Sequence, residues 1–532
     1  MFIVKRHCVY CNLPVTKSQT DKGCFHEQKK RKIITAAAVI LAVIIAFPGG
    51  IILKSKIRVA KLEKLSMDDS ATAKYAAEYL PDKDTIFGYA QDLYNMGVRM
   101  PGTPEGEQAQ SYVKDKFTQF GLENIEIIPS KTKLYTCENY SLSVNGENID
   151  CCYINYSGCD GSDGTFDTGD ITAQLVYVGS DTDSDVDVKG KIVVAEVGFT
   201  SLPYEICDVI GYLKYDPNNT FGMTDTKDVV YLGDSFTDGY FNYMEKGAAG
   251  YIGILTDYYD TAEYLSEDYT YYGDMTLPGM WVSNTDGTKI RELIDKDSTV
   301  TATLSMNGSL KEVDAGAVVG YVKGKSDETI MVQSHYDSIT KGAVEDASGM
   351  ACMLALAEMY SQIPSENLEK SILFIATDTH FSDYDTHDAV VEKLFGDDGN
   401  IVANLCIEHI CEEYEINDDG TISDTGEVDA RVVFVSGSKK LISITNEEFV
   451  RHGMDRTLVL PATLLGDSLC TDADEFYQEG VPVVNLISSP VYLYSSDDTI
   501  DKIPEEQLVP TCETMSDILW RLMELSADEI KN

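Results

Sequence analysis

Positive charge is scarce in this sequence, and its scarcity excludes one class of partner. The 532 residues include 42 Lys and Arg against 88 Asp and Glu, a formal net charge of −46. A surface of this sign repels a phosphate backbone, so we expect no nucleic-acid binding. With 43% hydrophobic residues the chain lacks the composition of a disordered protein, and its length suffices for two or three folded domains.

One stretch near the N-terminus lacks charge altogether. Residues 33–53, IITAAAVILAVIIAFPGGIIL, lie between Lys32 and Lys54 and have about the length needed to cross roughly 30 Å of hydrocarbon. A soluble core helix of this length would show a polar face, so we interpret the segment as a transmembrane helix. The basic cluster at 29–32 outweighs the positive charges that follow the segment. This predicts a single-pass cell-membrane protein with a cytoplasmic N-terminus and an extracellular ectodomain.

The basic tail, residues 1–32, contains a small group of metal-binding residue types. Cys8 and Cys11 form a Cys-x-x-Cys pair, and Cys24 and His26 follow with one residue between them. Four such ligands suit a tetrahedral Zn²⁺, but the second spacing is atypical. A small zinc ribbon and free cytosolic thiols are both open interpretations, and a weaker hypothesis is a sensor coupled across the membrane. The other ten cysteines permit disulfides without establishing them.

The chain beyond the hydrophobic segment divides into three parts by pattern. Residues 54–167 begin with helical spacing of apolar positions, and residues 168–310 contain short β-rich runs punctuated by Gly and Asp. Residues 311–532 alternate predicted strands with predicted helices. The strands are expected at 330–333, 371–376 and 401–407, and the helices at 347–360 and 388–395. This alternation predicts an α/β fold with helices covering the sheet.

Polar side chains follow three successive predicted strands of this last part. Parallel strands end at one edge of a sheet, which is where ligands bind. His335 follows the first strand, and Asp337 can hold its imidazole in the tautomer that offers the other nitrogen to a metal. His380 follows the second strand and Glu408 follows the third. The convergence of these residue types predicts a metal site.

A pair of carboxylates lies between the first two of these strands. Glu345 and Asp346 precede the helix predicted at 347–360, where the helix dipole favours anions. One acid of the pair is expected only to cap the helix, and the spacing does not say which one.

These motifs, in this order, resemble the co-catalytic zinc exopeptidases. That family includes secreted bacterial aminopeptidases, glutamate carboxypeptidase, glutaminyl cyclase and the non-catalytic transferrin receptor. The resemblance lies in residues 330–349 and 401–408, in Gly480-Val-Pro, and in Arg99-Met-Pro-Gly-Thr upstream. Within 168–310, the runs VKGKIVV, EKGAAGYI and LPGMWVS resemble a protease-associated domain. The resemblance extends from about residue 85 to the end and implies a zinc-exopeptidase-like mixed sheet, with helices on both faces, that carries this domain as an insert.

The resemblance implies one metal site. The residues that match its first zinc are His335 with its supporting Asp337, the bridging acid Glu345 with Asp346 adjacent to it, and the acidic ligand Glu408. The second zinc is expected to be absent. The family's paired glutamates, a general base and then a ligand, fall on His380 and Phe381, and its last histidine falls on Tyr494. Phenylalanine cannot ligate a metal and tyrosine is a poor zinc ligand, so we expect at most one Zn²⁺, with Phe381 and Tyr494 lining the substrate pocket.

The role of His380 is open among three hypotheses. It could be the general base, a fourth ligand beside His335, Glu345 and Glu408, or a relic in a surface that only binds. One zinc suffices in principle to activate water. The leading prediction is therefore a membrane-anchored metallopeptidase that removes N-terminal residues from peptides. The alternative is a catalytically silent receptor or scaffold that binds a protein partner.

Overall fold

The computed structural model describes residues 56–532, apart from 223, 233, 267–268, 397–399, 466–467 and 470. The chain forms two compact units, Met1–Arg58 and Val59–Asn532, and the second is described here. The predicted transmembrane segment 33–53 and the group Cys8, Cys11, Cys24 and His26 lie outside the described residues. Among the helices within the described ranges, none is both long and apolar enough to cross a membrane.

The helices are α3 (Ala71–Tyr75), α4 (Lys83–Met96), α5 (Pro104–Phe120), α6 (Tyr204–Ile210), α7 (Asp234–Glu245), α8 (Asn284–Lys296), α9 (Gly349–Ser361), α10 (Asp385–Gly396), α11 (Lys439–Arg451), α12 (Asp474–Gln478), α13 (Glu505–Met523) and α14 (Ala527–Lys531). The strands are β1 (Glu123–Val144), β2 (Glu147–Ile149), β3 (Cys152–Tyr153), β4 (Gly164–Asp167), β5 (Ile171–Gly179), β6 (Ile192–Val197), β7 (Thr200–Pro203), β8 (Leu213–Tyr215), β9 (Thr226–Val229), β10 (Gly250–Leu255), β11 (Gly279–Ser283), β12 (Thr301–Val322), β13 (Ser326–His335), β14 (Lys370–Thr377), β15 (Ile401–Ile407), β16 (Glu412–Ile416), β17 (Ile422–Val428), β18 (Arg431–Val435), β19 (Thr457–Pro461) and β20 (Val483–Ile487).

Parallel strands form the centre of the main sheet. The order is β12-β14-β13-β15-β20-β18-β19-β8, in which β14, β13, β15 and β20 run parallel. Because β14 is buried along its whole length, its side chains serve two cores. Ile372 and Phe374 pack in the core that includes α9, whereas Leu373 and Ile375 pack with side chains of α10 and α12. The predicted α/β alternation over 330–407 is confirmed, since each expected strand and helix is present.

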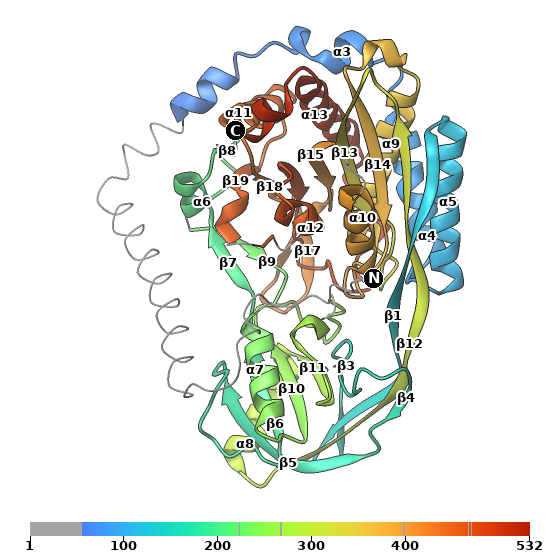
Figure 1. Cartoon of the computed structure of the whole chain (residues 1–532). Helices are drawn as coiled ribbons and strands as arrows, with labels where there is room; N and C mark the ends of the chain where they lie inside the picture. The colour runs from blue at the N-terminus through green and yellow to red at the C-terminus, as the bar shows by residue number, and fades with distance from the viewer. Residues whose placement is uncertain are drawn as a thin grey trace, which may run out of the picture. The chain divides into compact units, whose positions relative to one another are not determined.

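Two long antiparallel strands link the main sheet to a second one. β1 and β12 pair from Glu123 opposite Tyr321 to Val144 opposite Ala302. One end of β12 pairs with β14 and the other end with β5, so the strand belongs to both sheets. Figure 1 shows β1 and β12 running from the main sheet toward β5, β6 and β10. The polypeptide between these strands therefore leaves the main sheet and returns to it beside the same edge.

The second sheet lies within the part predicted to be β-rich, and it is in fact an α/β layer. Strands β5, β6, β10 and β11 are parallel, with α7 and α8 packed against them. Tyr251 of β10 packs with aromatic side chains of α7, and its neighbour Ile252 packs with Ile290 of α8. The two helices therefore cover opposite faces. The predicted β structure did not include α7. The aromatic residues of α7 have helical spacing, but its mean hydropathy is low, so the sequence pattern there is weak.

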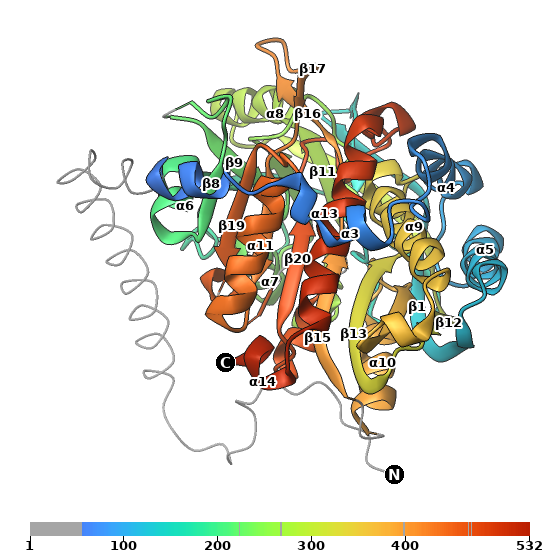
Figure 2. The ribbon, with the colours of Figure 1, turned by 90° about the horizontal axis from the view of Figure 1, so that it is seen from above.

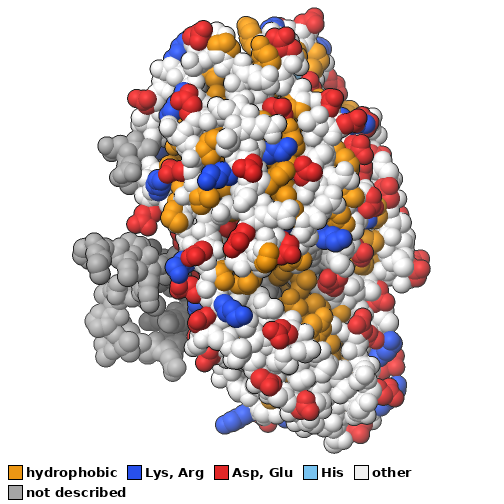
Figure 3. Space-filling view, turned by 90° about the vertical axis from the view of Figure 1, so that its right-hand side faces the viewer, with side chains coloured by type: hydrophobic (Ala, Val, Ile, Leu, Met, Phe, Trp, Pro, Cys, Tyr) orange, Lys and Arg blue, Asp and Glu red, His pale blue; other side chains and the backbone are white. Residues whose placement is uncertain are grey.

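The described surface agrees with the acidic composition. Figure 2 shows the ribbon from above, with α4 and α5 at its right-hand side. Figure 3 shows acidic side chains spread across the face that forms the right-hand side of Figure 1, where β1, β12 and α5 lie. The nine cysteines within the described residues are all free thiols.

Candidate metal centre

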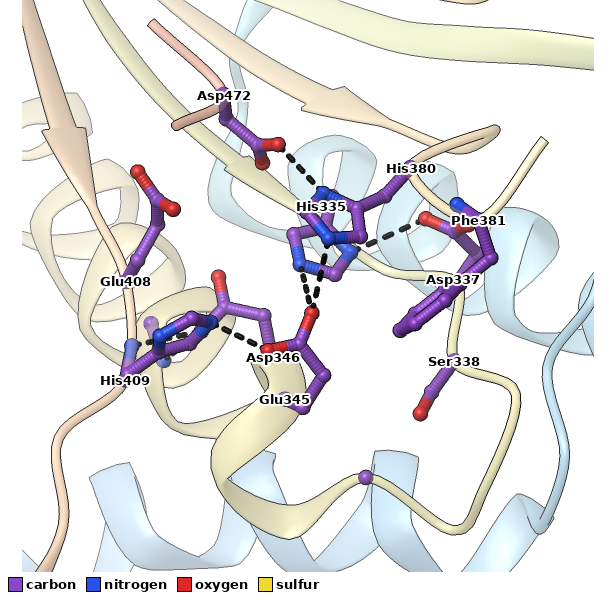
Figure 4. A network of polar contacts seen from close by, with 12 residues as sticks. His335, Asp337, Ser338, Glu345, Asp346, His380, Phe381, Glu408, His409 and Asp472 are labelled. Atoms are coloured by element: carbon purple, nitrogen blue, oxygen red, sulfur yellow. Dashed lines mark hydrogen bonds and ion pairs between the residues drawn. The ribbon is translucent and has the colours of Figure 1, made fainter. Parts of the chain in front are cut away.

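The candidate site lies at the carboxyl ends of three neighbouring parallel strands (Figure 4). His335 is the last residue of β13, His380 follows the end of β14, and Glu408 and His409 follow β15 directly. Because β13 pairs with both β14 and β15, these three ends meet at one edge of the sheet. All four side chains are buried.

The carboxylate of Glu345 stands at the centre of the site. Its Oε1 lies 3.2 Å from Nε2 of His335 and 3.3 Å from Nε2 of His380. Its Oε2 lies 2.5 Å from Nε2 of His409. Glu345 belongs to η3 (Ala343–Ser348), the turn that leads into α9. The Asp498 carboxylate accepts the backbone N–H of Glu345 at 3.0 Å and that of the preceding residue at 2.8 Å, which fixes this turn.

Each of the three imidazoles is held by its other nitrogen. Nδ1 of His335 lies 3.1 Å from Oδ1 of Asp337, and Nδ1 of His380 lies 2.7 Å from Oδ1 of Asp472. Nδ1 of His409 donates to a backbone carbonyl, the oxygen of residue 488, at 2.8 Å. Since these partners are acceptors, each Nδ1 carries a proton, and Nε2 is the nitrogen that is directed at Glu345. Such support is typical of histidines that bind metals.

The donor set fits a zinc ion. His335, Glu345 and His380 each offer one ligand atom, and the three atoms lie within 4.8 Å of one another. Within the described residues, Nε2 of His335 and both carboxylate oxygens of Glu345 are buried and make no hydrogen bond. Buried polar atoms are seldom left this way unless an ion or water satisfies them. Imidazole nitrogen and carboxylate oxygen are both ligands that zinc takes.

The electrostatics of the site keep Glu345 ionised. Burial raises the pKa of the Glu345 carboxyl. The neighbouring His409 and His380 lower this pKa by more, so that it lies well below its usual range. Burial lowers the pKa of His409, but the nearby Glu345 carboxylate has the larger, opposite effect and raises this pKa to about 10. These shifts favour an ionised Glu345 beside a protonated His409 in the metal-free protein.

The other two acids predicted as ligands lie differently. Asp346 directs its carboxylate to the hydroxyl of Ser334 at 2.5 Å and to the backbone N–H groups of Gly349 and His409 at 3.2 and 3.1 Å. It therefore organises the turn and does not face His335. Oε1 of Glu408 accepts from the Cys406 thiol at 3.0 Å and the Asn485 amide at 2.5 Å, and Oε2 makes no hydrogen bond within the described residues. Burial and the nearby Asp472 raise the pKa of Glu408 to about 8.

Aromatic side chains occupy the positions where the second zinc's ligands are expected. Phe381 and Tyr494 are buried and pack edge to face, with ring centroids 6.4 Å apart. Phe381 also packs against the ring of His380 at 4.8 Å.

Two residues of the site were not predicted from the sequence. Asp472 lies in the segment before the short α12, where no motif marks it. His409 follows Glu408 in the sequence, and the family resemblance favours the acid at this strand end. The stronger signal is the small number of histidines, seven in the whole chain, of which His380 and His409 lie within three residues of the ends of parallel strands, in addition to His335.

Comparison with known proteins identifies the fold and a family segment. Residues 317–379 match the model of peptidase family M28. The fold is similar to a peptidase M28 precursor from Shewanella amazonensis SB2B, at 16% identity over 91% of this chain and 99% of that one, with a TM-score of 0.62. It is also similar to BSAP, a zinc aminopeptidase from Bacillus subtilis, at 16% identity over 85% and 99% of the two chains, with a TM-score of 0.56.

An aminopeptidase from Aneurinibacillus sp. strain AM-1 has the same fold, at 18% identity over 83% of this chain and 94% of that one, with a TM-score of 0.54. No curated protein matches the sequence significantly. The family segment and the shared fold confirm the predicted resemblance to co-catalytic zinc exopeptidases. The family segment contains His335, Glu345 and Asp346 and ends at Thr379, directly before His380.

Proposed function

We propose that this chain is a zinc metallopeptidase that removes N-terminal residues from peptides, with one metal ion held by His335, Glu345 and His380. The observation that supports this most strongly is the convergence of two Nε2 atoms on one buried carboxylate oxygen, at 3.2 and 3.3 Å. The peptidase family segment and the aminopeptidase fold support this reaction class.

The residues around the ion have separate tasks in this proposal. A bound zinc ion lowers the pKa of water and polarises a carbonyl, which is the chemistry that amide hydrolysis needs. Asp337 and Asp472 fix the rings of His335 and His380 through Nδ1, at 3.1 and 2.7 Å. Of the three roles open for His380, that of ligand is the best supported, because its Nε2 approaches the same oxygen as Nε2 of His335.

Substrate access in this proposal requires movement of a covering segment. The ligand side chains are at most 3% exposed, and Tyr494, whose ring packs against that of Phe381, is 5% exposed. The backbone N–H of Leu265 donates to the Tyr494 carbonyl at 2.8 Å, and the Tyr259 hydroxyl donates to that of Ser495 at 2.6 Å. These contacts tie the segment 256–265 to Tyr494 and Ser495, and in this proposal their release would open a path for a peptide.

Hydrolysis of chromogenic aminoacyl amides by the full chain tests this function. Zinc-loaded protein should release the chromophore, and both chelation and His335→Ala should abolish the release, because the ion activates the water. A fully zinc-loaded protein that hydrolyses no aminoacyl or peptidyl amide would contradict the proposal.

That negative result would favour a second function, in which the chain keeps the peptidase fold but only binds a protein partner and catalyses no reaction. The buried site and the lack of a carboxylate at positions 380 and 381 favour this alternative. A protein of this kind would keep its zinc for structure, so metal content alone does not separate the two functions.

The anchoring and the domain boundaries are further parts of the proposal. The uncharged segment 33–53 would span the membrane with residues 1–32 inside, and 168–310 would be a protease-associated-like insert between 54–167 and 311–532. Between β1 and β12 the chain forms a second layer of parallel strands, and this supports the interpretation of 168–310 as an insert. Protease added to intact cells should digest the large part and spare the tail, whereas digestion of the tail alone would reverse the topology.

A further inference from the structure

We propose that the hairpin β16–β17 is a latch whose tip, at Gly420, holds the segment 256–265 in place and thereby controls access to the candidate site. The need for an opening rests on the function proposed above, in which a peptide must reach ligand side chains that are at most 3% exposed. The contact between tip and segment is a backbone hydrogen bond, in which the N–H of Asp260 donates to the Gly420 carbonyl at 2.8 Å.

The hairpin is a firm arm that is separate from the main sheet. β16 and β17 pair with each other in a two-stranded sheet, and Figure 2 shows them projecting from the rest of the ribbon. In the turn between them, the N–H of Asn417 donates to the Thr421 carbonyl at 2.8 Å, and the Thr421 hydroxyl donates to the Asp419 carboxylate at 2.6 Å. These hydrogen bonds within the turn hold the tip in the shape that presents the Gly420 carbonyl.

The base of the hairpin is fixed beside the site. β16 begins at Glu412, three residues after His409. The Tyr492 hydroxyl donates to the Glu412 carbonyl at 2.8 Å, and the Tyr492 ring packs edge to face with Tyr414 at a centroid distance of 5.2 Å. The hairpin therefore connects the strand end that carries His409 to the segment 256–265.

That segment is linked to the site by a series of aromatic contacts. The ring of Tyr264 packs edge to face with that of Tyr494, with centroids 5.5 Å apart, and the N–H of Leu265 donates to the Tyr494 carbonyl at 2.8 Å. Tyr494 in turn packs with Phe381 at 6.4 Å, and Phe381 packs with the ring of His380 at 4.8 Å. Movement of the segment would therefore remove packing that extends to the ring of His380.

The tip contact depends on a glycine. Gly420 has a φ of 83°, in the left-handed region, and a Cβ at this position would lie 2.6 Å from Cβ of Asp260. Only a residue without a side chain allows the two backbones to approach this closely. Because Asp260 is exposed and Gly420 half-buried, the contact buries little apolar surface and can break at small cost.

The same hairpin offers a matched control. Gly426 of β17 has a similar φ of 75°, but a Cβ there would meet no described atom within 4 Å beyond its chain neighbours. Alanine therefore introduces comparable backbone strain at both positions, and only at position 420 does it also separate the tip from the segment.

The test compares the full chain, kept metal-free with a chelator, with Gly420→Ala and Gly426→Ala. Hydrogen exchange of 256–265 measures release of the segment, and the rate at which diethyl pyrocarbonate modifies His335 measures access to the site. A further variant, in which Asn-Gly replaces residues 417–421, removes the tip by means of a two-residue turn that suits a hairpin, and it substitutes for Gly420→Ala if that variant does not fold.

We expect Gly420→Ala and the shortened turn to raise both rates by about 3- to 10-fold, the effect of losing one hydrogen bond. Gly426→Ala should match the parent. Unchanged exchange of 256–265 would overturn the latch, faster exchange with unchanged modification of His335 would overturn its control of access, and an equal rise in Gly426→Ala would assign the effect to strain. Neither readout needs bound zinc or turnover, so hydrolysis by the zinc-loaded parent tests the proposed function separately.

Discussion

At the scale of single residues, the sequence indicated the residues that meet at the candidate site but not their full surroundings. His335, Glu345 and His380 could be identified because two of them follow strands of strong apolar character and the third opens a helix. Asp472 could not, because it is brought to His380 by the tertiary fold from a segment without a motif. That His409 and not Glu408 contacts Glu345 depends on one backbone turn, which a period-2 pattern does not encode.

The role of His380 leads to a prediction at this scale. If His380 is a ligand, His380→Ala should lower zinc affinity and abolish hydrolysis together, because its Nε2 shares an oxygen of Glu345 with His335. Zinc content after dialysis and amide hydrolysis should be measured on the same preparation. A variant that keeps its zinc and loses roughly 10²–10⁴-fold in rate would instead make His380 the general base.

At the scale of elements, one buried arginine organises the loop between β13 and α9. Arg99 is fully buried, and its guanidinium donates to carbonyls of Tyr336 at 2.8 Å, Gly342 at 3.0 Å and Leu93 at 3.2 Å, and to that of Lys341 at 2.5 Å. The loop carries the supporting Asp337 at its start and reaches Glu345 at its end. The Arg99-Met-Pro-Gly-Thr motif noted in the sequence thus supports the metal site through backbone contacts.

Arg99→Met should therefore destabilise both the fold and the site. The change leaves several buried carbonyls without donors, at a cost on the order of 3–5 kcal/mol. Chemical denaturation measures the loss, and zinc affinity of the folded fraction should fall as well. Arg99→Lys should recover little, because an ammonium cannot donate to carbonyls spread around a planar fork. Full stability in Arg99→Met would contradict this account of the loop.

A second element-level contact joins α11, α13 and the start of α3, and it gives a pH dependence. Nε2 of His452 lies 2.9 Å from Oδ2 of Asp517, whose Oδ1 accepts the backbone N–H of Thr72 at 2.7 Å. Burial lowers the pKa of His452, but Asp517 and Glu513 together have the larger, opposite effect and raise this pKa to about 9. His452 and Asp517 also form a cluster of potential metal ligands with Glu448, but two arginines already bind Glu448.

The pKa of His452 in the folded protein exceeds the unfolded value of about 6.5. The contact between His452 and Asp517 therefore stabilises the folded protein fully below pH 6.5, and this stabilisation is lost as pH rises through 9. His452→Gln should cost about 1–3 kcal/mol at pH 6.5 and much less near pH 10. Denaturant titrations at both pH values measure the difference, with the exposed Glu524→Gln as control. An equal cost at both pH values would assign the effect to packing alone.

The element boundaries also show why the fold was more predictable than the insert. β13, β14 and β15 are buried on both faces, and parallel strands of this kind have continuous apolar sequences. In 168–310, by contrast, α7 is rich in Tyr and acidic residues, so its hydrophobic face is visible only once Phe236 and Tyr240 are placed against the sheet.

At the scale of the whole molecule, charge is the dominant property. Acidic side chains outnumber basic ones by 88 to 42, and this excess destabilises a compact state through self-repulsion. Added salt should therefore stabilise the protein, since the Debye length falls to about 10 Å at 0.1 M.

We expect Tm to rise by a few degrees, on the order of 2–5, between low salt and ~0.15 M sodium chloride. Thermal scans in choline chloride control for specific sodium binding and should give the same increase. A fall in Tm with salt would mean that favourable ion pairs outweigh the net repulsion.

The central claim is that one metal ion binds at the edge of the sheet where His335, Glu345 and His380 meet. Elemental analysis of the dialysed full chain beside His335→Ala tests it most directly, because any ion held by Cys8, Cys11, Cys24 and His26 cancels in the difference. The account predicts that wild type holds one zinc ion more per chain than the variant. A difference of two would mean that the second site is intact, and equal metal content in the two proteins would contradict the metal centre.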